Sequence, residues 1–245
     1  MKRIITMNFL LVLAFSMAFV ACRDPKTNII TGAVTDIDGN TYDAVKIGDQ
    51  IWMKDNLAVS RLRDSTPLGD KRYVQKPYGS YYNNKLIKND TVASQLCPEG
   101  WHIPTKTEWE NLIDAVSGNS KWISTSGNVA VSMSSAPQGV EDDSAKTYNT
   151  SGFSSMSGGY RMTMASFPPT HSSQDMFETG KNGYYWSSTI NEENMDPYAV
   201  CIDVEKGTVK LMKTMQTYPI PSNTWPPHVG VIYSNICISV RCVKD

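Results

Sequence analysis

The sequence has almost no net charge and very little histidine. Its 23 lysines and arginines are balanced by 24 aspartates and glutamates, for a formal net charge of -1. That balance gives no electrostatic basis for binding nucleic acid. The histidines are dispersed, and none has metal-ligand spacing to another histidine or cysteine. We therefore expect no nucleic-acid partner, no cofactor and no resident metal.

Catalytic motifs and long helical periodicities are missing as well. The sequence contains no recognisable Ser-His-Asp arrangement, phosphate-binding loop or dinucleotide fingerprint. We therefore expect a protein that is not an enzyme. Glycine, serine, threonine, asparagine and aromatic residues are plentiful, which favours a strand-based, loop-rich fold.

A long apolar run occurs only at the N-terminus. Lys2 and Arg3 precede the apolar stretch from Ile4 to Val20, and small Ala21 stands before Cys22. This order is typical of a secretory signal peptide, and a run of about 17 residues is at the low limit for a membrane span. The letters FVAC resemble the lipobox of bacterial lipoproteins. We predict a lipoprotein signal peptide over residues 1–21, lipidation of Cys22, and a polar tether over residues 22–31.

The stretch LCPEGWHIPTKTEWENLIDAVSG predicts one well-defined helix. Thr105 and Glu108 have the spacing of a capping box, in which each side chain accepts a backbone N–H of the first turn. Gly118 is placed to end the helix. The helix has one apolar stripe, formed by Trp109, Leu112, Ile113 and Val116.

The rest of the domain reads as strands and turns. Residues 32–57 predict a β-meander with turns at Asp38-Gly39 and Gly48-Asp49. The letters DIDGN lack the glycine position and the distant glutamate of an EF-hand loop, so they indicate a hairpin turn. A second short helix is expected near Val129–Ser135. Two strands joined by a glycine turn are expected in GFSSMSGGYRMTMASF, a strand in YYWSST, and a hairpin at Glu205-Lys206-Gly207.

Four cysteines remain once Cys22 is assigned to lipid, and an exported chain favours two disulfides. Three pairings are possible. In NICISVRCV, alternation places Cys242 on the apolar face and Cys237 on the other. Cys201 likewise shares a face with acidic neighbours, whereas Cys97 stands just before the helix. We therefore predict the pairs Cys97–Cys242 and Cys201–Cys237.

Six blocks in order carry a family resemblance: VTDIDGNTYDAVKIGDQIWMKDNL, YGSYYN, LCPEGWHIPTKTEWENL, SGFSSMSGGYR, GYYWSST and SVRCVKD. Together they resemble the Fibrobacter succinogenes major paralogous domain, which is abundant in lipoproteins of Bacteroidetes and Fibrobacteres. The resemblance covers residues 32–245. It implies an α+β, C-type-lectin-like fold with twisted antiparallel sheets, one or two flanking helices and long loops. An early hairpin would pair with the terminal strand.

The resemblance implies a function only in outline. We expect a lipid-anchored protein of the cell envelope, at the outer membrane or cell surface, whose lectin-like domain binds a glycan or a protein. The candidate ligand-binding residues are Tyr160, Arg161, His171, Trp225 and His228, of which all but His171 are expected to be exposed. A weak candidate for calcium is the loop that contains Glu192, Glu193, Asn194 and Asp196. A solvated acidic loop is the simpler interpretation.

Two alternatives accompany this expectation. Cys237, Arg241 and Cys242 match the active-site cysteine pair of formylglycine-generating enzymes, which bind copper through two thiolates. Strand alternation and the two further cysteines favour structural disulfides instead. The other alternative is a purely structural or pilus-associated component of the envelope.

Overall fold

The structure is a computed structural model that describes residues 28–117, 129–136, 148–167, 172–213 and 230–245. Asp38-Gly39 and Gly48-Asp49 turn the chain as predicted, with both glycines at positive φ. They separate β1 (Ile29–Thr35), β2 (Thr41–Ile47) and β3 (Gln50–Met53). The meander continues into a five-stranded antiparallel sheet of order β1-β2-β3-β13-β6, with β13 (Val243–Lys244) and β6 (Trp101–His102).

Two further antiparallel sheets complete the strand framework. The second sheet has the order β11-β10-β9. It consists of β9 (Asn182–Asn191), β10 (Asp196–Asp203) and β11 (Thr208–Met212). The third sheet has the order β4-β5-β12-β7-β8. It consists of β4 (Arg72–Gln75), β5 (Gly79–Asn83), β12 (Gly230–Ile238), β7 (Tyr160–Phe167) and β8 (Ser172–Phe177). The prediction of an α+β fold with antiparallel sheets is confirmed.

The described helices are short, apart from one. They are α1 (Asn84–Ile87), α2 (Asp90–Ala93), α3 (Lys106–Ser117), α4 (Val129–Met133) and a 3-10 turn, η2 (Gly69–Lys71). The backbone N–H of Thr105 donates to Glu108 at 2.8 Å, and that of Glu108 donates to Thr105 Oγ1 at 3.2 Å, which confirms the capping box. The predicted stop at Gly118 lies outside the described residues.

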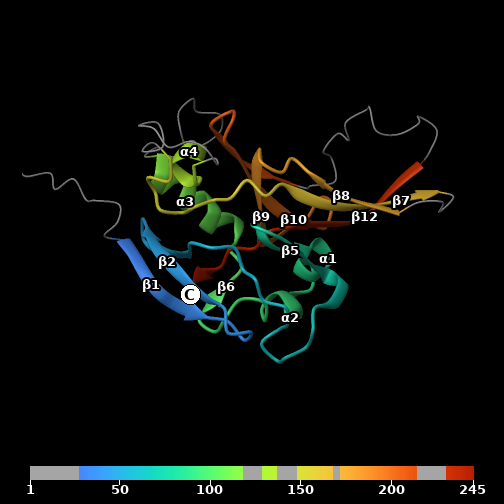
Figure 1. Cartoon of the computed structure of the whole chain (residues 1–245), viewed down its shortest axis with the longest axis horizontal. Coiled ribbons are helices and arrows are strands. Elements are labelled where there is room, and N and C mark those ends of the chain that lie inside the picture. Colours follow the sequence, from blue (N-terminus) through green and yellow to red (C-terminus); the bar gives the residue numbers. More distant parts are fainter. Residues whose placement is uncertain (1–27, 118–128, 137–147, 168–171, 214–229) are drawn as a thin grey trace, which may run out of the picture.

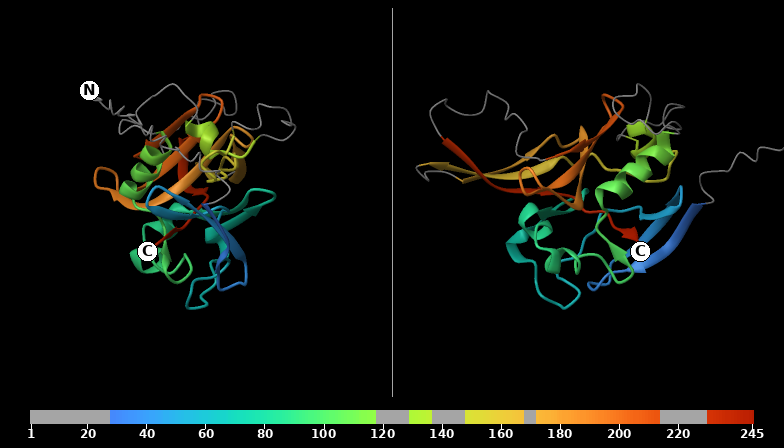
Figure 2. Two further views of the ribbon diagram at one scale, coloured as in Figure 1. Left: turned by 90° about the vertical axis from the view of Figure 1, so that its left-hand side faces the viewer. Right: turned by 180° about the vertical axis from the view of Figure 1, so that it is seen from behind.

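The helix α3 fills the angle between two sheets. It packs against β2 on one side and β9 on the other, and Figure 2 shows it between the N-terminal meander and the strands of the second sheet. Trp109, Leu112 and Ile113 are buried there, as the apolar stripe predicts. The helix α4 packs against β10 and β11 and covers the same apolar cluster. Figure 1 shows the other end of the molecule, where β7, β8 and β12 extend away from α3 and α4.

The C-terminal segment joins all three sheets. β12 pairs with β5 and β7, Ser239 forms a bridge to Tyr185 of β9, and Val243 of β13 pairs with Trp52 of β3. The early hairpin therefore meets the terminal strand, as the family resemblance implies. The continuous strand assumed for NICISVRCV is wrong, because the chain leaves one sheet at Ile238 and enters another at Val243.

Two other predictions concern the middle of the chain. The short helix near Val129–Ser135 is confirmed as α4. The segment GFSSMSGG is not a strand, since regular pairing begins only at Tyr160.

Within the described residues, no helix has both the length and the apolarity that a membrane span requires.

Candidate functional site

Tyr160 and Arg161 are not exposed, so their assignment to a binding surface is wrong. Their exposed fractions are 2% and 8%. The Tyr160 ring stacks on Phe177 at a centroid distance of 5.3 Å, and the Arg161 guanidinium lies 4.2 Å from the centre of the Tyr73 ring. The physical reason is that both faces of β7 are covered here: Tyr160 also packs edge-on against Tyr184 of β9, and Arg161, on the opposite face, lies over Tyr73 of β4. His171, Trp225 and His228 lie outside the residues whose side chains are described.

The carboxylates of the acidic loop between β9 and β10 are exposed or paired with lysines of other segments. Glu192, Glu193 and Asn194 are exposed, but Asp196 is buried and forms an ion pair with Lys88. Glu193 forms an ion pair with Lys213 at 2.7 Å. The described residues contain no group of three or more His, Cys, Asp or Glu arranged to hold a metal ion.

One of the two predicted disulfides forms, and the other does not. Cys97 and Cys242 form a disulfide with a Cα–Cα distance of 6.1 Å, which links the segment before α3 to the last strand. The Cys201–Cys237 pair is wrong, because both thiols are free and buried. Cys201 lies on β10 in the second sheet, whereas Cys237 lies on β12 in the third. The faces assigned to them as polar are covered by protein.

The free thiols are not a reactive pair. Burial raises the pKa of Cys201 to about 12 and that of Cys237 to about 11. A thiolate is the nucleophile and the metal ligand, so both groups are inert near neutral pH. Cys242 is bonded to Cys97 and cannot act with Cys237 as a copper-binding couple. The resemblance to formylglycine-generating enzymes rested on Cys237 and Cys242, and these two residues do not form the pair of free thiols that it requires.

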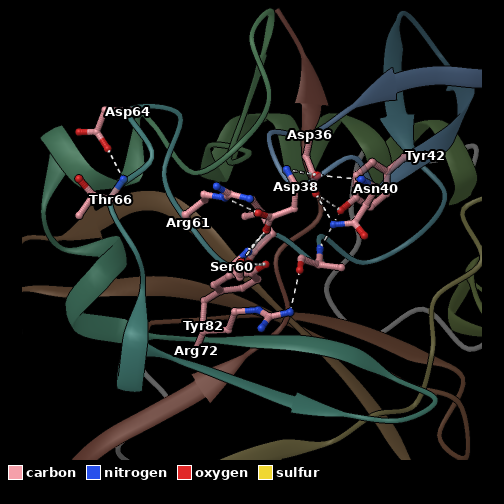
Figure 3. A network of polar contacts seen from close by, with 12 residues as sticks. Asp36, Asp38, Asn40, Tyr42, Ser60, Arg61, Asp64, Thr66, Arg72 and Tyr82 are labelled. Atoms are coloured by element: carbon pink, nitrogen blue, oxygen red, sulfur yellow. Dashed lines mark hydrogen bonds and ion pairs between the residues drawn. The ribbon is translucent and has the colours of Figure 1, made fainter.

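The DIDGN turn uses its carboxylates to hold the chain, as Figure 3 shows. Asp36 accepts hydrogen bonds from the backbone of Asp38 and Asn40 and from the hydroxyl of Tyr42. Asp38 accepts from Ser60 and forms an ion pair with Arg61. Burial opposes ionisation of Asp38, but the contacts with Arg61 and Ser60 prevail and lower its pKa to about 2. Asp36 thus closes the turn itself, and Asp38 fastens the first hairpin to the loop after β3.

A cavity of about 770 Å³ opens where six segments of the chain meet. We call it the tyrosine–serine cavity. It is lined by Pro77, Tyr78, Ser135, Ala136, Tyr148, Ser155, Met156, Ser157, Gly180, Lys181, Val204 and Glu205. Gly158 beside it is required for close packing, since a Cβ there would lie 2.4 Å from the Tyr81 hydroxyl oxygen and 2.9 Å from Tyr78 Cβ.

Most polar side chains of this cavity are unengaged. The phenol groups of Tyr78 and Tyr148, the hydroxyls of Ser135 and Ser157, the Lys181 ammonium and the Glu205 carboxylate have no hydrogen-bond or ion-pair partner in the described part of the chain. Ser155 differs, because its hydroxyl lies 2.9 Å from the Tyr185 hydroxyl. Two rings, two hydroxyls, one cation and one anion thus face one hollow, which offers flat apolar surface together with donors and acceptors.

Sequence reasoning missed every residue of this cavity. The stretch YGSYYNN stands out as tyrosine-rich, but it has no periodicity that would indicate where Tyr78 points. Glu205 belongs to a predicted hairpin turn, where exposed charge is ordinary, and no motif singles out Lys181. The cavity forms only in the folded chain, where these segments lie next to one another.

A family model matches residues 45–244, and its description is the Fibrobacter succinogenes major domain. The chain belongs to this family. The match lies within the domain expected over residues 32–245 and includes all residues of the tyrosine–serine cavity. No curated protein and no solved structure matches the chain.

Most of the motifs that carry the resemblance lie within the matched residues, and the first motif begins before them, at Val34. The matched region begins within β2 and ends within β13, so it spans all three sheets and the disulfide. The candidate site is thus part of the family domain itself and not of a separate appendage.

Proposed function

We propose that this protein is a lipid-anchored, non-catalytic component of the bacterial cell envelope whose domain binds a saccharide in the tyrosine–serine cavity. The observation that carries the proposal is the set of unengaged groups around one hollow: two tyrosine rings, two hydroxyls, one ammonium and one carboxylate. Saccharides present apolar C–H faces and many hydroxyls, and such a set can both stack on them and exchange hydrogen bonds with them.

The anchoring part of the proposal is supported by the N-terminal sequence. A positive start, an apolar run and the letters FVAC before Arg23 have the order of a lipoprotein signal. If Cys22 carries the lipid, metabolic labelling with a fatty acid will mark the native protein, and Cys22→Ser will abolish the label. Retention of the label in this variant would contradict the assignment.

A glycan array with the purified protein tests the binding function. The saccharide that binds is then titrated against Tyr148→Ala and Lys181→Ala. We expect each variant to weaken binding about tenfold, which corresponds to about 1.4 kcal/mol. Tyr198→Ala is the matched control, because Tyr198 is also a half-buried tyrosine but lies outside the cavity. Binding by no saccharide on the array, or equal losses in the control, would contradict the proposal.

A further inference from the structure

A second hollow, of about 690 Å³, follows the outer edge of the second sheet. We call it the lysine groove. It is lined by Lys106, Glu110, Tyr198, Lys206, Thr208, Val209, Lys210, Leu211, Met212 and Lys213. Successive side chains of a strand point to opposite faces, so a hollow above one face would be lined by alternate residues. Here every residue of β11 lines it, and the groove therefore runs along the backbone edge of this strand.

Among the described residues, no strand pairs with this edge. β11 is the outermost strand of the second sheet and pairs with β10 on its inner side. In the described part of the chain, its outward N–H and C=O groups have no hydrogen-bond partner. The side-chain oxygen of Thr208 is buried and also lacks a partner. An open strand edge is a template for another strand.

The charges around the groove favour an acidic partner. Its lining contains four lysines and one glutamate. Lys106, Lys206 and Lys213 form ion pairs with Glu110, Asp203 and Glu193. The exposed Lys210, at the centre of β11, has no ion pair within the described residues. A strand that binds here would place a side chain beside this ammonium group, which acts on the Asp203 carboxylate through its charge but holds no ion pair within the described residues.

The groove also offers apolar surface to such a strand. Leu211, Met212 and Tyr198 are half-buried on its walls, and Val209 is buried in the cluster beneath. Peptides that add to a sheet edge gain affinity from main-chain hydrogen bonds and specificity from alternate side-chain contacts. All of these elements occur along β11.

We propose that β11 accepts an extended acidic peptide segment of a partner protein by strand addition in the lysine groove. This interaction is separate from saccharide binding in the tyrosine–serine cavity and does not depend on it. The backbone edge would bind the main chain of the segment, and Lys210 would bind one of its carboxylates.

The test uses the purified protein and a synthetic peptide in which glutamate and valine alternate. We expect the peptide to bind and to protect the amides of Thr208–Met212 from hydrogen exchange. A peptide with lysine in place of glutamate is expected to bind at least about tenfold more weakly. A third peptide keeps the glutamates but is N-methylated at alternate residues, and it is expected not to bind because its main chain cannot pair.

Lys210→Glu is the decisive variant, and Lys85→Glu on α1 is its control because Lys85 is exposed and lies outside the groove. We expect Lys210→Glu to bind the glutamate peptide about tenfold or more weakly than the wild type does, and to bind the lysine peptide more tightly. We expect Lys85→Glu to leave the affinity for both peptides unchanged. Full binding of the N-methylated peptide would show that charge attraction alone holds the peptide, without main-chain pairing, and would overturn the proposal. An unchanged affinity in Lys210→Glu would also overturn it, since this lysine would then only guard the edge against aggregation.

Discussion

Arg241 is a buried cation that forms no close ion pair within the described residues, although the charge of Asp55 acts on it. Its side chain is fully buried and donates to the carbonyl of Phe153, to Asn56 Oδ1 at 2.7 Å and to the carbonyl of Ser154 at 3.2 Å. Its guanidinium also lies 4.4 Å from the centre of the Phe153 ring and 5.2 Å from that of Tyr185. Burial lowers its pKa, so neutral acceptors and aromatic faces must replace the lost water.

We predict that Arg241→Met lowers the free energy of unfolding by about 3 kcal/mol, measured by urea denaturation. Methionine fills part of the volume but leaves Asn56 Oδ1 and two carbonyls without their donor. Arg63→Met is the control: Arg63 is exposed and donates to the Ser94 carbonyl, and its loss should cost less than about 1 kcal/mol. An unchanged or raised midpoint in Arg241→Met would show that the cost of burying the charge cancels its contacts.

At the scale of elements, His102 fastens three segments to one another. It stands on β6, and its ring nitrogens lie 2.8 Å from Glu108 in the first turn of α3 and 2.6 Å from Asp245 after β13. The hydrogen bond to Glu108 raises the pKa of His102, burial opposes this, and Asp245 adds to it, so the pKa reaches about 9. Sequence spacing gives His102 no partner, whereas the structure makes it a charged link between three segments.

This link predicts a pH dependence of stability. The pKa of His102 is higher in the folded state than its ordinary value of 6.5, so its contribution is complete below about pH 6.5 and is lost as the pH rises through about 9. The side chain is 35% exposed, and solvent screening limits the effect to about 0.5–1 kcal/mol. The unfolding free energy of the wild type should fall by this amount across the window relative to His102→Gln. Parallel pH profiles for the two proteins would contradict the prediction.

At the scale of the whole molecule, one disulfide closes most of the domain. Cys97 and Cys242 are 145 positions apart in sequence, and their bond joins the entry to α3 with the segment that passes through all three sheets. A crosslink that closes a long loop restricts the unfolded chain most, and removing one from an exported domain typically costs 2–5 kcal/mol.

We predict that replacing both Cys97 and Cys242 by alanine lowers the free energy of unfolding by about 4 kcal/mol. The control replaces both Cys201 and Cys237 by alanine, which leaves two small cavities and should cost only about 1–2 kcal/mol. Titration of a Cys22→Ser protein under denaturing conditions should find two thiols, and titration of the folded protein should find none that reacts quickly. A denatured protein with no free thiol would contradict the assignment of Cys201 and Cys237.

The sequence by itself determined those features that depend on near neighbours. The Thr105–Glu108 capping box, the apolar stripe of α3 and the glycine turns of the meander involve residues a few positions apart, so spacing alone specifies them. The cysteine before the helix and the apolar face assigned to Cys242 predicted the Cys97–Cys242 bond, whereas the same strand alternation gave the wrong Cys201–Cys237 pair. Six ordered motifs were enough for the family.

Only the tertiary structure decided which faces are covered and which turns meet. Alternation separates the two faces of a strand, but it cannot say that both are buried, as happens at Tyr160, Arg161, Cys201 and Cys237. The tyrosine–serine cavity unites residues from 77 to 205, and the lysine groove exists because β11 is an outer strand. The physical reason is that burial and cavity shape depend on contacts between distant segments, which local spacing does not encode.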